Sequence, residues 1–178
     1  MKIPPSFHLS LTENCRPLAA EIAAITRQAF EREYGSGETE ARIIDALRVA
    51  GDVIVELAAV EAGAVVGLAM FSRLTVYSPD RKIAALGPVC ARIDRQRAGI
   101  GSALIREGLA RCAAQGCDAV VVLGDPGYYG RFGFTLEAAE ALQSEYSGPH
   151  FQALELRPEA LAGGPWRVVY PRAFSRLD

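Results

Sequence analysis

A short glycine-containing segment offers the clearest chemistry in the sequence: Gln96-Arg97-Ala98-Gly99-Ile100-Gly101-Ser102. It follows a strand-like run and precedes an apolar stripe with helical spacing, so its two glycines fall where a strand gives way to a helix. Glycine lets the backbone approach a ligand closely. The free N–H groups of a helix start, together with the helix dipole, attract anions. The segment therefore predicts a pyrophosphate cradle, although glycines at this place could simply turn the chain.

Two common phosphate motifs fit this segment less well. A Walker loop requires Gly-Lys-Ser/Thr, which does not follow, and Leu104 stands where a dinucleotide fingerprint has its third glycine. The run just before the segment has Gly87-Pro88 in its interior. Because proline lacks an N–H and glycine tolerates unusual dihedral angles, we expect a bulge or a lost ladder bond there. An edge strand or a turn is the alternative, and these residues taken alone favour it.

The cysteines and histidines carry no comparable signal. They are scattered and lack the paired C-x-x-C spacing of zinc or redox sites. We therefore expect no metal and reduced, mostly packed thiols, and a Cys-His nucleophile remains a minor alternative. The residues are Cys15, Cys90, Cys112, Cys117, His8 and His150.

The elements that must position the glycine segment follow from hydrophobic spacing. The strand before it, the helix after it and the run Ala119 to Leu123 together predict a β-α-β unit. Glu61-Ala62-Gly63 is suited to a hairpin. We expect a mixed sheet with helices on its faces and a docked carboxy-terminal segment. The predicted helices are Arg16–Glu33, Thr39–Ala50, Ile100 to Gly116 and Tyr128–Phe132; the predicted strands are Phe7–Leu11, Val53–Val60, Ala64–Val76, Ile83–Ile93, Ala119–Leu123, Phe151–Leu156 and Trp166–Tyr170.

Length and composition narrow the class of protein. With 178 residues, half of them apolar, the chain is expected to form one domain over residues 1–178. Its 19 basic and 21 acidic residues disfavour a dedicated nucleic-acid binder. The amino terminus lacks the pattern of a secretory signal, and no apolar run is long enough to span a bilayer. We expect a cytoplasmic protein that does not bind membranes.

These motifs resemble those of the GCN5-related N-acetyltransferase (GNAT) superfamily. Its coenzyme A loop, Q/R-x-x-G-x-G/A, matches Gln96 to Gly101, and its later Y-x-x-x-G-F element matches Tyr129 to Phe134. The run Leu123 to Tyr129, Leu-Gly-Asp-Pro-Gly-Tyr-Tyr, is similar to a bacterial, YhbS-like branch of predicted N-acetyltransferases, as is the ending Ala153-Leu154-Glu155-Leu156. Ile93 replaces a proline common among relatives, and Gly124-Asp125-Pro126 replaces their asparagine after the fifth strand.

The resemblance implies an α/β (α+β) fold: a mixed, mostly antiparallel sheet flanked by helices, with a splayed pair of parallel strands at the cofactor site. It also implies acetyl transfer from acetyl-CoA to a primary amine through a tetrahedral intermediate, without a metal. The acceptor would be a small molecule or a protein amine. A homodimer is compatible with the sequence. A sensor that binds acyl-CoA without turnover is the alternative, and acetylation of aminoacyl-tRNA would require a basic face.

The same resemblance assigns site residues. The thioester would lie along the strand segment Val89 to Ala91, and the pyrophosphate would bind the loop Arg97 to Ser102. The implied cofactor-binding residues are Val89, Cys90, Ala91, Gln96, Arg97, Ala98, Gly99, Ile100, Gly101 and Ser102. Tyr129 would protonate the leaving thiolate, unless it is only a core aromatic. The cluster Arg92, Arg95 and Arg97 would supply positive charge, or form a solvated loop. No general base is assigned, because Asp125 and Glu33 can each be explained as an ordinary carboxylate of a turn or of the surface.

Overall fold

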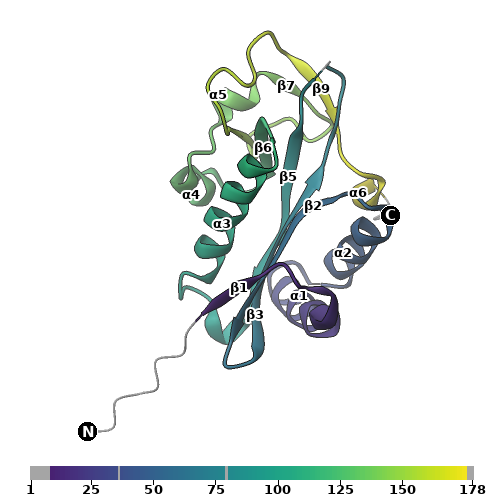
Figure 1. The fold of residues 1–178 in the computed structure, drawn as a ribbon, viewed down its shortest axis with the longest axis vertical. Coiled ribbons are helices and arrows are strands. Elements are labelled where there is room, and N and C mark those ends of the chain that lie inside the picture. Colours follow the sequence, from purple (N-terminus) through teal and green to yellow (C-terminus); the bar gives the residue numbers. More distant parts are fainter. Residues whose placement is uncertain (1–8, 36, 79, 176–178) are drawn as a thin grey trace, which may run out of the picture.

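A six-stranded β-sheet forms the centre of the computed structural model, which describes residues 9–35, 37–78 and 80–175 (Figure 1). Its strand order is β1-β2-β3-β5-β6-β8, and neighbouring strands are antiparallel except for the parallel pair β5 and β6. This arrangement confirms the expected fold class. The strands are β1 (Ser10–Thr12), β2 (Val53–Glu61), β3 (Ala64–Arg73), β5 (Ile83–Ala91), β6 (Ala119–Leu123) and β8 (Phe151–Glu155).

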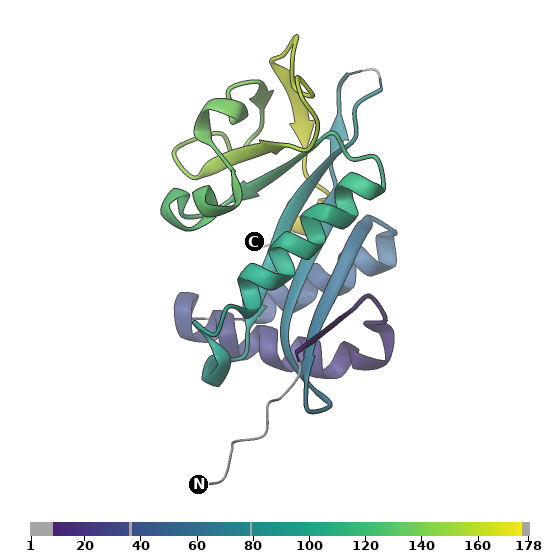
Figure 2. The ribbon, with the colours of Figure 1, turned by 60° about the vertical axis from the view of Figure 1, so that its left-hand side comes forward.

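Helices cover both faces of the sheet (Figure 2). α1 (Ala19–Tyr34) and α2 (Glu38–Ala50) pack on one face, and α3 (Ile100–Ala114) packs on the other. The helical spacing of Ile22, Ile25 and Ala29 explains how α1 buries one stripe against the sheet. The shorter helices are η1 (Arg16–Leu18), η2 (Ile93–Arg95), α4 (Pro126–Tyr129), η3 (Gly130–Phe132), α5 (Leu136–Ala139) and α6 (Arg172–Ser175).

Two connections expected from the sequence are confirmed. β2 and β3 form a hairpin in which Glu61 faces Ala64, and the two residues between them, Ala62 and Gly63, both have positive φ, 50° and 79°. Two such residues give a turn whose twist suits a two-residue hairpin. β5, α3 and β6 form the β-α-β unit, with β5 and β6 parallel over Ile83–Leu86.

Other expectations need correction. The predicted strand Ala64–Val76 breaks at Leu74, a buried residue whose N–H bonds to the Ile83 carbonyl at 3.1 Å, and the chain continues as β4 (Thr75–Val76). The predicted strand Trp166–Tyr170 does not join the main sheet. Instead, β9 (Trp166–Val169) lies between β4 and β7 (Leu142–Gln143) in a three-stranded sheet.

The ends of three predicted elements also shift. Ile93 leaves the strand and opens η2, so β5 ends at Ala91. The first predicted helix splits into η1 and α1. Of the predicted strand Phe7–Leu11, residues 7 and 8 lie outside the described residues, and β1 begins at Ser10. The docked carboxy-terminal segment is confirmed, because Phe174 packs against the core beneath α1 and α2 and also against the core beneath the small sheet.

Two glycines let α3 lie close to β3. A β-carbon at Gly108 of α3 would come within 2.1 Å of the Phe71 ring. A β-carbon at Gly67 of β3 would come within 2.6 Å of Ile100, the first residue of α3. Real side chains do not approach this closely, so both positions accommodate only glycine in this packing. The start of α3 is thereby fixed against the sheet.

Candidate active site

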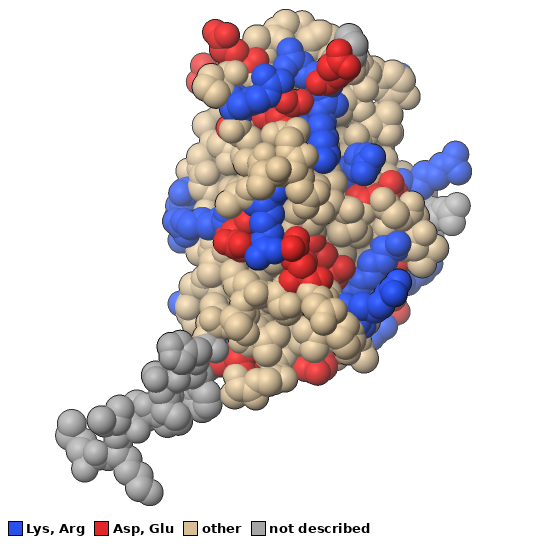
Figure 3. Space-filling view, in the orientation of Figure 1, with Lys and Arg blue, Asp and Glu red and all other residues tan. Residues whose placement is uncertain are grey.

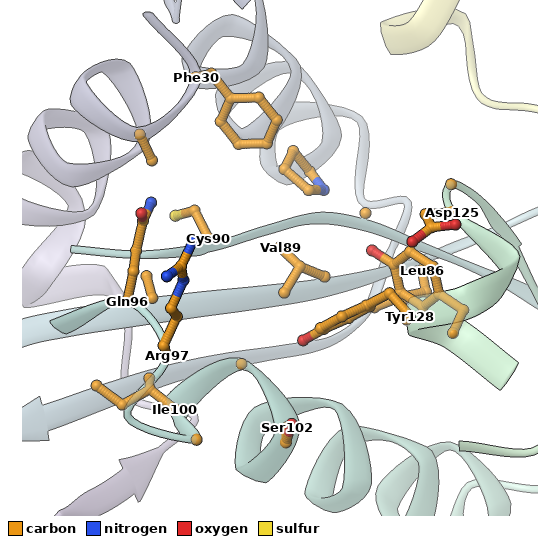
Figure 4. Close-up of a pocket in the computed structure, with 18 of the residues that line it drawn as sticks. Phe30, Leu86, Val89, Cys90, Gln96, Arg97, Ile100, Ser102, Asp125 and Tyr128 are labelled. Carbon is orange, nitrogen blue, oxygen red and sulfur yellow. The ribbon is translucent and has the colours of Figure 1, made fainter. Parts of the chain in front are cut away.

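A cavity of about 820 Å³ opens where β5 is interrupted and α3 begins (Figure 4). Phe30 of α1 lies on one side of it and Ser102 of α3 on the other. Of the residues that the sequence analysis assigned to cofactor binding or thiolate protonation, all but Ala98 line the cavity. The predicted residues that line the cavity are Val89, Cys90, Ala91, Gln96, Arg97, Gly99, Ile100, Gly101, Ser102 and Tyr129.

The interruption in β5 is a β-bulge at Gly87-Pro88. Leu86 pairs with Phe71 and Val89 pairs with Ala69, so two residues of β5 stand opposite the single residue between them on β3. Gly87 has φ 148°, a backbone conformation that favours glycine. The predicted bulge is therefore confirmed. It also shifts the alternation of the strand, so that Leu86 and Val89 both face the α3 side.

β5 and β6 separate at the same point. The last parallel pair is Leu86 with Val122, and β6 ends one residue later at Leu123. From Val89 to Ala91, β5 stays paired with β3 alone among the described strands. The edge of β5 that faces β6 is therefore open along the cavity. A linear ligand with amide groups could lie in this gap and complete the sheet.

The loop before α3 is shaped for an anion. Arg97 and Gly99 both have left-handed backbones, with φ 64° and 82°. The first turn of α3 is closed by Ala103 N–H donating to the Gly99 carbonyl at 2.9 Å. The N–H groups of Ile100, Gly101 and Ser102 precede this bond and are left outside the helical ladder. Ordered donors at the positive end of a fifteen-residue helix provide an anion-binding concavity.

The three arginines of this region differ in their partners. Arg92 forms an ion pair with Asp94 at 2.6 Å and does not line the cavity. Arg95 lines the cavity but is paired with Glu61. Arg97 also lines the cavity and takes part in none of the ion pairs found among the described residues. Arg97 is therefore the cation of this group that can meet an anion without losing a partner.

Two tyrosines reach the cavity from α4. The rings of Tyr128 and Tyr129 meet edge to face with centroids 5.0 Å apart. Tyr128 lies toward α3, since a β-carbon at Gly101 would come within 3.1 Å of its hydroxyl oxygen. Tyr129 lies against Gly124, the residue that follows β6, since a β-carbon at this glycine would come within 2.4 Å of its ring. Both rings also pack on the core beneath α3. Each ring therefore contacts the core on one side and the cavity on the other.

Asp125 is the sole carboxylate in the cavity lining among the described residues. Its Oδ1 accepts a hydrogen bond from Gly127 N–H at 3.0 Å, which caps the start of α4. The side chain of Glu33, the other carboxylate considered from the sequence, lies outside the described residues. The cavity lining also contains residues to which the sequence analysis assigned no role: Ala29, Phe30, Leu86, Leu123 and Arg131.

The cysteines behave as packed thiols. All four are free and buried. Cys90 faces α1, where its sulfur lies 3.6 Å from the Thr26 hydroxyl, and burial raises its pKa to about 11. A thiol with that pKa is protonated at neutral pH and is a poor nucleophile. The described residues contain no group of three His, Cys, Asp or Glu side chains arranged to hold a metal ion.

On the face shown in Figure 3, basic and acidic side chains lie side by side rather than in separate fields. Such mixing is not what a nucleic-acid-binding face presents. Over the described part of the chain, no helix has the length and apolar character needed to cross a membrane.

The fold and the cavity define a class of α/β protein in which a sheet opens beside an anion-binding helix start. The comparisons identify the family. Residues 19–134 match the Acetyltransferase (GNAT) family. The chain is also 33% identical over 162 residues to YhbS of Escherichia coli strain K12, an uncharacterized N-acetyltransferase, covering 89% of this chain and 94% of YhbS. The chain therefore belongs to the GNAT family of N-acetyltransferases.

Solved structures agree with this assignment. The crystal structure of Escherichia coli YhbS in complex with CoA superposes with a TM-score of 0.88 at 30% identity, covering 100% of this chain and 98% of that one. A GNAT family acetyltransferase from Brucella melitensis in complex with acetyl-CoA has a TM-score of 0.79 at 36% identity, covering 94% and 98%. The resemblance noted from the motifs is thereby confirmed.

Proposed function

We propose that this chain transfers the acetyl group of acetyl-CoA to a primary amine of a small molecule or a protein, and that residues 1–178 act as one domain. The observation that carries the proposal is one continuous cavity that joins the anion-binding start of α3, the open edge of β5 and the ring of Tyr129. These are the three features that a diphosphate, an amide-containing arm and a departing thiolate would each require.

The residues present suit acetyl-CoA as donor. The N–H groups of Ile100, Gly101 and Ser102 would hold the pyrophosphate, with Arg97 adding positive charge. The pantetheine arm would lie along Val89 to Ala91, where β5 has no strand on its β6 side. The complexes of the two relatives with CoA and acetyl-CoA support acetyl-CoA as the donor by analogy.

The chemical step follows from this arrangement. The amine nitrogen attacks the thioester carbonyl carbon and forms a tetrahedral intermediate, whose oxyanion would be stabilised by a backbone N–H next to the Gly87-Pro88 bulge. The carbon–sulfur bond then breaks. The thiol formed from the leaving group should have a pKa near the cysteine value of about 8.5, so a phenol of pKa about 10 can protonate the departing thiolate. We propose Tyr129 for this role, and the proton lost by the attacking amine balances the one given to sulfur.

A screen for thiol release tests the proposal. Purified protein would be mixed with acetyl-CoA and a panel of amines, amino acids, polyamines and peptides, and free CoA thiol would be measured over time. At least one amine should release thiol and yield an acetylated product by mass spectrometry. Binding of acetyl-CoA without release across the whole panel would instead favour a non-catalytic acyl-CoA sensor.

A further inference from the structure

A glutamine is buried in the apolar core directly behind the candidate site. Gln152 of β8 is 1% exposed and pairs with Val122 of β6. Residues that face each other across an antiparallel pair point to the same side of the sheet. Val122 belongs to the core beneath α3, together with Phe134. Gln152 therefore places an amide among apolar side chains on the side where α3 and α4 lie.

The nitrogen and the oxygen of this amide differ in their hydrogen bonding. Its Nε2 donates to the Gly124 carbonyl at 3.1 Å, whereas its Oε1 is buried without a hydrogen-bond partner among the described residues. A buried acceptor without a partner destabilises the folded state, so a glutamine that served stability alone would be better replaced by an apolar residue. The bond to Gly124 is what the side chain contributes at this position.

Both backbone groups of Gly124 are held, one by β8 and one by His150, the residue before that strand. Its N–H donates to the His150 carbonyl at 3.0 Å, and its carbonyl accepts from Gln152. The Tyr129 ring lies directly on it, since a β-carbon there would approach the ring to 2.4 Å. The next residue, Asp125, accepts the Tyr129 N–H on its carbonyl oxygen at 3.0 Å. Any displacement of the Gly124 peptide is therefore transmitted to Tyr129 by contact.

We propose that Gln152 is a positioning residue for the acetyl transfer, which fixes the Gly124 carbonyl and thereby the ring of Tyr129 at the cavity. This inference rests on the proposed function and on the assignment of Tyr129 to thiolate protonation. Gln152 does not line the cavity and acts through its neighbour. The sequence places the two partners 28 residues apart, so only the pairing of β6 with β8 brings them together.

A double-mutant cycle tests the proposal. Gln152→Met keeps an unbranched side chain of similar length and removes both the donor and the unpartnered oxygen. Misplacement of a reacting group costs up to about a hundredfold in rate, so kcat should fall roughly tenfold or more, with the acetyl-CoA dissociation constant changed by less than about twofold. In a Tyr129→Phe background the same substitution should cause no further loss of kcat, because its effect passes through the missing hydroxyl.

Ser72→Ala is the matched control, because Ser72 is likewise fully buried with an unpartnered oxygen and outside the cavity lining. It lies on β3 and pairs with Val53 and Ala85, so it is not bonded to Gly124. The Ser72→Ala variant should keep the kcat of the unmodified protein. Unchanged kcat in Gln152→Met, or losses that multiply in the double variant, would overturn the proposal. If both Gln152→Met and Gln152→Leu failed to fold, the residue would be structural and the proposal would be wrong.

A crystal structure of Gln152→Met separates this inference from the proposed function. If the unmodified protein released no thiol with any amine, the proposed function would fail, yet the structural claim could still be read from that crystal. Displacement of the Tyr129 ring from Gly124 would support the positioning role. A ring that stayed in place while Gly124 kept its backbone geometry would contradict it.

Discussion

The hydroxyl of Tyr128 lies so close to Gly101 that a β-carbon at this glycine would come within 3.1 Å of the oxygen. α4 and the first turn of α3 therefore meet at one point on the cavity wall. A contact this short is tighter than side chains normally make, so any substitution at Gly101 must displace Tyr128 or the start of α3. Gly101 thus has two reasons to be glycine, its neighbour and the ligand that the loop is expected to hold.

Gly101→Val should abolish acetyl-CoA binding while the fold survives. The branched side chain would project into the space beside the helix-start N–H groups and against the Tyr128 hydroxyl. Isothermal titration calorimetry would measure the affinity, and circular dichroism would report the fold. Gly130→Ala is the control, because that glycine has an ordinary backbone, φ −55°, and no atom near its absent side chain. Undiminished affinity in Gly101→Val would make the glycine a turn residue only.

Acetyl-CoA should raise the thermal midpoint of unfolding. A ligand that binds only the native state adds roughly 2.7 kcal/mol at a hundredfold excess over its dissociation constant. Differential scanning fluorimetry with acetyl-CoA, NAD and ATP at equal concentration would measure the effect. The latter two should protect less, because the loop lacks the dinucleotide and Walker signatures. Greater protection by NAD would indicate that the loop binds a dinucleotide and would contradict the proposed function.

Tyr129→Phe should lower turnover selectively. The change removes the proposed proton donor and keeps the ring that packs on Gly124. General acid catalysis contributes typically about a hundredfold or more, so kcat with a confirmed amine should drop on that order while acetyl-CoA affinity changes little. Tyr128→Phe, on the same short helix, is the control and should keep its kcat. Equal kcat values in the two variants would show that Tyr129 serves only as a core aromatic.

Substitutions of Asp125 should distinguish the effect of its helix-capping hydrogen bond from the effect of its negative charge. Asparagine can still accept the Gly127 N–H, whereas alanine cannot. Asp125→Ala should therefore lose about 1 kcal/mol of stability, which corresponds to roughly 2–4 °C in thermal midpoint for a chain of this size. Asp125→Asn should keep the midpoint and the acetyl-CoA affinity. If the asparagine variant lost as much stability as the alanine variant, the capping bond would not be the source of the effect.

Local patterns predict the backbone features around the candidate site. The glycines at the start of α3, the bulge at Gly87-Pro88 and the hairpin at Ala62-Gly63 were all readable because each depends on a few consecutive residues. The choice of Tyr129 over Tyr128 came from the family resemblance alone. In the structure the two rings diverge, toward Gly124 and toward Gly101, and no helical or strand periodicity distinguishes them.

Features that depend on pairing between strands far apart in the sequence could not be predicted from it. β4 and β7 are two residues long, too short for a periodic signal, and each pairs with β9, which lies far from both in the sequence. The bond of Gln152 to Gly124 requires the register of β6 with β8. In the sequence Gln152 is one polar residue in a strand, and its burial follows only from the core around its partner Val122.

The contact of Ile100 with Gly67 bears on how this protein can evolve. Ile100 both lines the cavity and fills the space above Gly67, a residue of the central hairpin that has no part in the cavity lining. The start of α3 is therefore held in place by packing behind the cavity, and we expect acetyl-CoA to bind without rearrangement of this loop. In a deep mutational scan, Gly67 should tolerate no other amino acid, although it lies outside the cavity lining.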